Sequence, residues 1–186
     1  SQNGCSNCHD THNANGKERL LKREAEEDNC LDCHNGNVSN TNIQTELSKP
    51  YRHDVYAYTG IHDPIESDIN KIKHIECVDC HNAHASNSNT AEAPLVKGAN
   101  LGVKGISRSG MAVNPALNEY EICFNCHADN AMVQEKTTRY LGSSNTRQDF
   151  NPNNVSMHPV IEEGRNNNPR GLITPYDASS KIYCSS

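Results

Sequence analysis

Four copies of one short cysteine motif constrain this chain more than any other feature of its sequence. Each copy reads Cys-x-x-Cys-His, and eight of the nine cysteines belong to these copies. Two thiols one short turn apart can reach the two vinyl groups on one edge of a porphyrin and form thioethers. The histidine that follows then lies under the ring, where an imidazole is a usual proximal ligand of haem iron. The predicted attachment cysteines are Cys5, Cys8, Cys30, Cys33, Cys77, Cys80, Cys123 and Cys126, and the predicted proximal ligands are His9, His34, His81 and His127.

Covalent haem explains these motifs better than the other uses of paired cysteines do. Zinc is the strongest alternative, because two Cys-x-x-Cys pairs can form a tetrahedral site. Disulfides suit an exported chain, and a thioredoxin-like pair needs a βαβ pattern, which this sequence lacks. Neither zinc nor a disulfide accounts for a histidine directly after the second cysteine in every copy. We therefore expect four covalently bound c-type haems.

The composition is too polar for an ordinary protein core. Hydrophobic residues make up 34% of the chain, tryptophan is absent, and the mean hydropathy is −0.82. Such a chain buries too little apolar surface to offset ordering entropy, which is roughly 1–2 kcal/mol per residue for the backbone alone. Porphyrins, each with the apolar area of roughly two or three aromatic side chains, supply the missing core. We expect a small haem-cored multihaem cytochrome fold, mostly irregular or loop, with a few short α-helices and little β-structure.

Charge and hydropathy exclude two classes of partner. The formal net charge of −6 and the pI near 5.9 argue against a nucleic-acid-binding surface, which needs a basic patch. No apolar run approaches the ~18 residues of a transmembrane helix. The sequence shows no signal peptide, so an exported protein has already lost its leader.

An internal repeat organises the remaining histidines. The order Cys-x-x-Cys-His-x-x-His, then Cys-x-x-Cys-His, then His-x-Val occurs twice. We expect one haem-cored domain built from two repeats, about residues 1–62 and 73–165, with a tail over 166–186. The candidate distal ligands are His12, His53, His84 and His158, with His62 and His74 as weaker candidates. The three methionines are alternative axial ligands, which the surplus of histidines makes unnecessary.

The repeat suggests which haem each distal histidine ligates. His12 and His84 each follow a proximal histidine by three residues, and on a helical turn the two rings would project from one face. We therefore predict that His12 ligates the second haem and His84 the fourth. The His-x-Val histidines, His53 and His158, then ligate the first and third haems.

Local patterns predict only short regular elements. The residue types predict three short helices: one over 16–28 that leads into the second motif, one over 115–122 that leads into the fourth motif, and one over 130–140. Alternating patterns are scarce, so few strands are expected. Residues 86–110 read as a turn-rich loop.

The motif order resembles multihaem c-type cytochromes of the doubled-CXXCH kind. Four haems in this length with little secondary structure is similar to the small tetrahaem cytochromes of the OmcE type, which polymerise into extracellular conductive filaments. The resemblance implies bis-histidine haems, export to the periplasm or the cell exterior, and end-to-end contact with further copies of the chain, to which His62 or His74 would donate a ligand. It also implies redox partner proteins or extracellular acceptors, with no nucleic-acid partner.

The expected function is electron transfer and not catalysis. Six-coordinate bis-histidine haems offer no open position to a substrate, and the distal position decides between activation and electron transfer. A filament subunit and a monomeric periplasmic carrier are two forms of this function. A multihaem reductase is the alternative from another class, and it needs a haem with a vacant distal position.

The ninth cysteine, Cys184, stands where the repeat would begin again. Residues 54–76 separate His53 from Cys77, and a segment of similar length, residues 159–183, separates His158 from Cys184. One interpretation is a lone cysteine in a disordered tail. The other is the first cysteine of a third repeat, in a chain that has been cut or that descends from a longer array.

Overall fold

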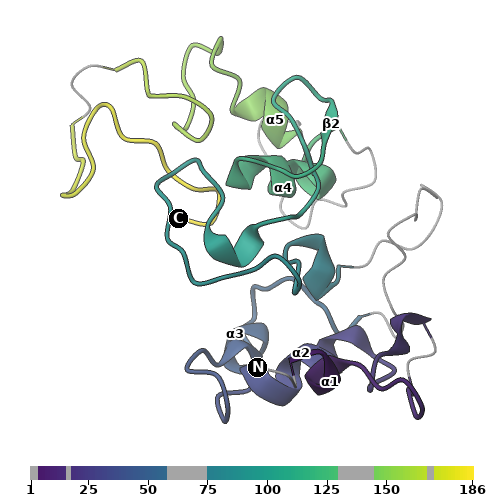
Figure 1. The fold of residues 1–186 in the computed structure, drawn as a ribbon. Coiled ribbons are helices and arrows are strands. Elements are labelled where there is room, and N and C mark those ends of the chain that lie inside the picture. Colours follow the sequence, from purple (N-terminus) through teal and green to yellow (C-terminus); the bar gives the residue numbers. More distant parts are fainter. Residues whose placement is uncertain (1–3, 16–17, 58–74, 130–144, 167–169) are drawn as a thin grey trace. The chain divides into compact units, whose positions relative to one another are not determined.

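The computed structural model of the chain describes residues 4–15, 18–57, 75–129, 145–166 and 170–186. Within these residues, short helices and one small sheet are joined by long irregular segments (Figure 1), which confirms the expected fold class. None of the helices described is both long and apolar enough to cross a membrane. With η marking a 3-10 helix, the elements are α1 (Gly4–Cys8), η1 (Glu18–Leu20), α2 (Glu26–His34), α3 (Ile43–Leu47), η2 (Cys77–Asp79), η3 (Gly98–Asn100), β1 (Gly105–Ile106), β2 (Ala112–Val113), α4 (Glu119–His127) and α5 (Thr146–Asp149).

The chain divides into two compact units, residues 1–78 and 79–186. Each unit contains a nine-residue helix that carries a whole motif, α2 in the first unit and α4 in the second. Each also contains a short helix with an asparagine cap. Asn42 accepts a hydrogen bond from a backbone N–H at the start of α3, and Asn145 does the same for α5. A single haem-cored domain made of two repeats stays a prediction.

The interior of the first unit is largely polar. The buried residues among those described in this unit are Glu26, Glu27, Asn29, Leu31, Val55 and Glu76. Only Leu31 and Val55 in this set are apolar. The side-chain amide of Asn29 is hydrogen-bonded to the loop before α2. Its Oδ1 accepts from the backbone N–H of Arg23 at 3.0 Å, and its Nδ2 donates to the carbonyl of Ala25 at 2.9 Å. The described residues therefore supply little hydrophobic core to this unit.

Both apolar clusters that the described residues form lie in the second unit. One cluster contains Tyr120, Phe124, Ala128, Val160 and Ile161, and the other contains Val103, Ala116 and Ile122. Helix α4 contributes to both clusters, and the rings of Tyr120 and Phe124 lie 5.3 Å apart between their centroids. The second unit therefore has a protein core centred on the helix that carries the fourth motif.

A two-stranded antiparallel sheet packs against α4. The register pairs Gly105 with Val113 and Ile106 with Ala112. A Cβ atom at Gly105 would lie 2.7 Å from the backbone oxygen of Glu121, closer than real Cβ contacts, so only glycine allows this approach of β1 to α4. The small sheet agrees with the expectation of few strands.

Two of the predicted helices differ from the structure. The helix predicted over 16–28 is wrong, because Arg19 and Leu20 have positive φ angles of 58° and 57° and α2 begins only at Glu26. The helix predicted over 115–122 begins at Glu119, with Asn118 as its cap, and continues through the motif to residue 127. The helix predicted over 130–140 lies outside the described residues.

Candidate haem-attachment sites

Both cysteines of a motif lie on one helix in three of the four copies. These pairs are Cys5 and Cys8 on α1, Cys30 and Cys33 on α2, and Cys123 and Cys126 on α4. In the third copy, Cys77 begins η2 and Cys80 follows its last residue. Side chains three residues apart on a helix share a face, so each pair can reach one porphyrin edge. None of the nine cysteines, all of which lie in the described part of the chain, forms a disulfide.

A capping box fixes the start of α4, the helix of the fourth motif. The carboxylate oxygen Oε2 of Glu121 accepts hydrogen bonds from the backbone N–H of Leu117 at 2.7 Å and of Asn118 at 2.9 Å. The side chain of Asn118 accepts from the backbone of Glu121 in return. These bonds satisfy N–H groups that the first turn leaves without a partner, so the helix starts at one defined residue and presents its cysteines in one orientation.

Two proximal histidines make the same hydrogen bond to a backbone carbonyl. His9 Nδ1 lies 2.8 Å from the carbonyl oxygen of Arg19, and His81 Nδ1 lies 2.8 Å from that of Ala99. A carbonyl oxygen can only accept, so Nδ1 carries the proton in both rings. This tautomer presents the lone pair of Nε2 for a metal, and the carbonyl orients the ring and raises its basicity. Both residues belong to the first motif of their repeat.

In the first unit a chain reversal delivers the carbonyl to His9. The N–H of Asp10 donates to the carbonyl of Leu20 at 2.8 Å, and the N–H of Lys22 donates to that of Cys8 at 2.9 Å. The reversal places Arg19 at a φ of 58°, a left-handed conformation that is unfavourable for a residue with a Cβ atom. The pairing with the first motif therefore explains why the predicted helix over this segment does not form.

In the second unit two asparagine side chains hold the equivalent segment against the third motif. Asn100 Nδ2 donates to the carbonyl of Cys80 at 2.8 Å, and Asn82 Nδ2 donates to the carbonyl of Gly102 at 3.0 Å. The carbonyl of Ala99 then faces His81. The two units use different contacts to reach the same result, a carbonyl on the Nδ1 of the proximal histidine.

The histidines that follow these motifs by three residues lie in Asx turns. At His12 the Asx turn replaces the predicted helical turn, whereas around His84 the N–H groups of Ala85 and Ser86 both donate to the carbonyl of Asn82, as in one helical turn. The N–H of His12 donates to Asp10 Oδ1 at 3.0 Å, and the N–H of His84 donates to Asn82 Oδ1 at 3.0 Å. Such turns arise because short polar side chains compete with the helix for backbone N–H groups. The hydrogen bond from the N–H of His12, followed by the one from Asn13, lowers the pKa of the Asp10 carboxyl. Both histidine side chains are exposed.

The two His-x-Val segments have the same local structure. The N–H of Val55 donates to the carbonyl of His53 at 3.2 Å, and the N–H of Val160 donates to that of His158 at 2.8 Å. Both valines are buried, and both histidines are exposed. Each valine therefore anchors its segment while the imidazole points outward. The role of these histidines as distal ligands stays a prediction.

An apolar hollow lies beside His158. Its lining includes Val155, Met157, Leu172 and Ile182. Two of these side chains are exposed although they are hydrophobic, Val155 at 98% and Leu172 at 47%, and polar side chains also line the hollow. Exposed apolar residues gathered at one site mark a binding surface for an apolar group. A hollow of this kind next to an exposed imidazole suits the face of a porphyrin.

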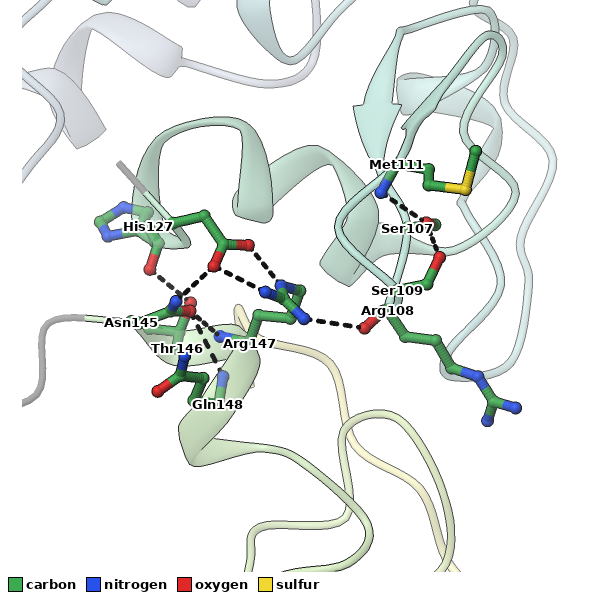
Figure 2. Close-up of polar contacts among 10 residues, drawn as sticks. Ser107, Arg108, Ser109, Met111, His127, Asn145, Thr146, Arg147 and Gln148 are labelled. Carbon is green, nitrogen blue, oxygen red and sulfur yellow. Dashed lines mark hydrogen bonds and ion pairs between the residues drawn. The ribbon is translucent and has the colours of Figure 1, made fainter. Parts of the chain in front are cut away.

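Figure 2 shows how the start of α5 is tied to the end of α4 at His127. Thr146 Oγ1 donates to the backbone carbonyl of His127 at 2.7 Å. Arg147 forms a two-point ion pair with Asp129, which lowers the pKa of that carboxyl, and also donates to the carbonyl of Arg108 at 3.3 Å. His127 is the last residue of α4 and its side chain is exposed, so these backbone contacts hold the residue in place and leave its ring facing outward.

Two pairs of cysteine thiols lie close together, an arrangement that motif analysis does not predict. Cys30 lies beside Cys77 in the first unit, and Cys123 lies beside Cys184 in the second. The neighbouring thiol and burial together raise the pKa of the Cys77 and Cys123 thiols. Each pair joins the first cysteine of a helical motif to a cysteine far along the chain. The only signal in the sequence is the spacing that places Cys184 in register with Cys77.

The remaining candidate ligands divide between described and undescribed parts of the chain. His34 ends α2 and its side chain is exposed. His62 and His74 lie outside the described residues. In the described ranges, no group of three or more His, Cys, Asp or Glu side chains is placed to hold a metal ion. The structure thus orients the imidazoles of His9 and His81 through ring hydrogen bonds, and it fixes the backbone of His12 and His84 in Asx turns.

The residues present fit covalent haem. Three of the four cysteine pairs lie on one helix, two proximal rings present Nε2, and an apolar hollow adjoins His158. The first unit also lacks an apolar cluster among its described residues, which leaves room for the ring to provide one. These features would hold a haem through thioethers from the cysteines and through the histidine imidazole.

Comparison with known proteins agrees with this fit. A family model described as the doubled CXXCH motif matches residues 1–39, which is about a fifth of the chain and includes its first two motifs. The match supports a multihaem c-type cytochrome in which CXXCH motifs bind haem covalently and the haems transfer electrons. No curated protein and no solved structure matches the chain.

Proposed function

We propose that the chain is a tetrahaem c-type cytochrome with bis-histidine ligation, which conducts electrons over long distances outside the cytoplasm. The observation that carries the proposal is the hydrogen bond from Nδ1 to a backbone carbonyl at His9 and at His81. A surface histidine has no need of a fixed tautomer, whereas a metal ligand almost always donates its second N–H in this way. The same bond therefore supports a ligand role for each of these residues.

The polypeptide would attach each haem covalently, ligate its iron and orient it. The eight motif cysteines would form the thioethers, and His9, His34, His81 and His127 would ligate from one side. His12, His53, His84 and His158 are the proposed ligands from the other side. A bound haem supplies a one-electron iron couple, whose potential depends on the axial ligands, hydrogen bonding and burial. With imidazole on both sides, no coordination position is left for a substrate.

Of the eight proposed ligands, His9 is partly buried and the other seven are exposed in the polypeptide, so the imidazoles are accessible to a haem. The proposed electron acceptors are redox partner proteins or extracellular acceptors.

We propose further that copies of the chain assemble into a filament in which haems of neighbouring subunits are in contact. The support is the resemblance in motif order to filament-forming tetrahaem cytochromes. A monomeric periplasmic carrier is the alternative. Negative-stain microscopy of the purified protein at high concentration separates the two, because a carrier gives isolated particles and a filament subunit gives continuous fibres.

Carbon monoxide tests the absence of an open coordination position. CO binds reduced haem iron only where a ligand is missing or weak. The visible spectrum of the reduced protein should therefore not change when CO is added. A spectral change that corresponds to a quarter or more of the haem would show a five-coordinate site and would favour a reductase. A protein purified without covalent haem would refute the proposed function altogether.

A further inference from the structure

Helix α4 ends abruptly at its candidate haem ligand. His127 is its last residue, and Ala128 after it is extended, with a φ of −125° and a ψ of 158°. Ala128 is buried in the apolar cluster around Phe124, and Asp129 has a positive φ of 38°. The carbonyl groups in the last turn of a helix have no partner within the helix, so helix ends fray unless other groups hold them. The candidate ligand therefore lies where α4 by itself is least rigid.

Arg147 connects the three segments that meet at this end of α4 (Figure 2). Its guanidinium forms a two-point ion pair with the carboxylate of Asp129, and its Nη1 donates to the carbonyl of Arg108 at 3.3 Å. A Cβ atom at Gly110, in the turn between β1 and β2, would lie 3.4 Å from the guanidinium carbon, so this turn packs against Arg147. The side chain of Arg147 is only 22% exposed. Its rigid fork of donors holds several partners in fixed directions at once, which a lysine cannot do.

Two neighbours of Arg147 complete the connection. Thr146 Oγ1 donates to the carbonyl of His127 at 2.7 Å, and Asn145 Nδ2 donates to Asp129 Oδ1 at 2.6 Å. Asn145 also caps α5, because its Oδ1 accepts from the backbone N–H of Arg147 at 3.1 Å. Three consecutive residues therefore hold the backbone on both sides of Ala128.

The corresponding helix of the first unit ends in another way. Helix α2 also ends on a candidate ligand, His34, but Asn35 after it has a φ of −94° and a ψ of 8°, and it pairs with Asn42 in an isolated bridge. The backbone thus continues close to helical geometry after His34, whereas it changes direction after His127. The ion pair at Arg147 holds this change of direction in place.

We propose that Arg147 is a positioning residue for His127, and that its ion pair with Asp129 fixes the plane of the His127 imidazole on the haem of the fourth motif. The inference rests on the proposed function, because it takes His127 to ligate haem iron. The imidazole points away from the guanidinium in Figure 2, so Arg147 acts through the backbone of residues 127–129. Backbone direction decides which rotamers of a side chain are allowed, and contacts outside the ligand set orient the ligands of a metal site.

The experiment compares the electron paramagnetic resonance spectra of the oxidised, haem-loaded full chain and its variants. The g values of a low-spin bis-histidine haem depend on the angle between its two imidazole planes. Arg147→Ala and Asp129→Ala break the ion pair from opposite sides, and each should change the g values of the same single haem of the four. The double variant should change them no further, because both substitutions remove one connection. Unchanged g values in Arg147→Ala would overturn the inference.

Two conservative variants test the connection without removing much volume. Arg147→Lys keeps the charge but loses the fork, so its g values should match those of Arg147→Ala. Thr146→Val removes the hydrogen bond to the carbonyl of His127 and should change the signal of the same haem, which identifies that haem as the one bound by His127. Full retention of the original g values in both variants would overturn the inference, even if Arg147→Ala fails to accumulate.

Reduction potentials separate positioning from an effect of charge alone. Arg147→Ala leaves a carboxylate without its cation, and Asp129→Ala leaves a cation without its carboxylate. Charge alone would therefore shift the potential of the fourth haem in opposite directions and leave the g values unchanged. That combination would overturn the inference, whereas equal g values in the two variants, different from those of the unaltered chain, would support it.

Arg108→Ala is the matched control. Arg108 forms an ion pair with Glu162 in the same unit, both side chains are more than half exposed, and neither residue adjoins a candidate ligand in the sequence. The backbone carbonyl that accepts from Arg147 stays in this variant, so its g values should be those of the unaltered chain. A change equal to that of Arg147→Ala would overturn the inference. An unaltered chain without any low-spin haem signal would remove the proposed function as well, whereas the other contrary outcomes leave that function intact.

Discussion

Glu121 is the residue whose replacement tests most directly how the fourth motif is positioned. Its carboxylate accepts two backbone N–H groups ahead of α4, and its side chain is 8% exposed. The Glu121→Ala variant removes the acceptor and leaves the N–H groups of Leu117 and Asn118 without it. The first turn of α4 should then fray, and this turn lies directly before Cys123.

The expected loss of stability follows from the bonds removed. A hydrogen bond to a charged group contributes about 1.5–3 kcal/mol, and a lost helix cap costs about 0.5–2 kcal/mol. The two bonds share one oxygen, and Leu117 is 66% exposed, so water replaces part of the lost interaction. We therefore expect Glu121→Ala to lower the free energy of unfolding by about 2–3 kcal/mol. Glu121→Gln keeps an acceptor without the charge and should lose about half as much.

Guanidinium unfolding, followed by circular dichroism and by the Soret band, measures this difference. Asp28→Ala is the matched control, because Asp28 has the equivalent place on α2 but is exposed there and α2 has no side-chain cap at Ala25. The control should change the free energy of unfolding by less than about 0.5 kcal/mol. Equal losses in Glu121→Ala and Asp28→Ala would refute the assignment of the capping box as the element that positions the motif.

Three further predictions concern the haem ligands, the core and the bound metal. Asn100→Ala frees the turn that places a carbonyl on His81 Nδ1, so the ligand becomes less basic and the reduction potential of its haem should rise by about 20–60 mV, from a lost bond of about 0.5–1.5 kcal/mol. Spectroelectrochemical titration measures this rise. Ser48→Ala, which removes a side-chain bond to the carbonyl of Thr45, should leave the potentials unchanged, and equal shifts in the two variants would exclude this role for Asn100. Phe124→Ala should lower the free energy of unfolding by about 3–5 kcal/mol. Leu31→Ala at the equivalent position of α2 should lower the free energy of unfolding by less, because Leu31 belongs to no apolar cluster among the described residues. Denaturant titrations compare the two variants. A larger loss in Leu31→Ala than in Phe124→Ala would argue against a protein core around α4. Prolonged treatment with EDTA should remove no iron and leave the visible spectrum unchanged, because the porphyrin holds iron and thioethers hold the porphyrin; release of zinc by EDTA would revive the zinc alternative.

The sequence predicts the sites of chemistry here better than it predicts the local backbone. The residue types at 5–9 and at 123–127 identify the motifs, because thioether formation requires that spacing. The low hydrophobic content predicts the loop-rich fold, and the structure confirms it. In both cases the prediction depends on chemistry or composition, which do not depend on how distant segments pair.

The predictions that were wrong depend on such pairing. Residues 16–28 contain good helix formers, yet this segment pairs with the first motif and the helix does not form. The N–H of Asp10 donates to the carbonyl of Leu20, and the N–H of Lys22 donates to the carbonyl of Cys8. The turn at His12 is decided by the side chain of Asp10, which accepts the N–H that a helix would have used. The Nδ1 bonds have backbone carbonyls as acceptors, and no residue type signals them. A tertiary pairing outweighs intrinsic helix propensity over residues 16–28, and a local side-chain bond does so at His12.

The polar interior of the first unit determines the order in which the protein can mature. Glu26 and Glu27 are 3% and 5% exposed, the Oε2 atom of each accepts no hydrogen bond, and burial raises the pKa of Glu27. Burying such groups is unfavourable, so we expect the described part of this unit to collapse only after its cysteines have reacted. The second unit has its own apolar clusters and can collapse earlier. We therefore expect the half of the chain that is synthesised first to fold last, and to depend on the attachment machinery and on protection from proteases in the meantime.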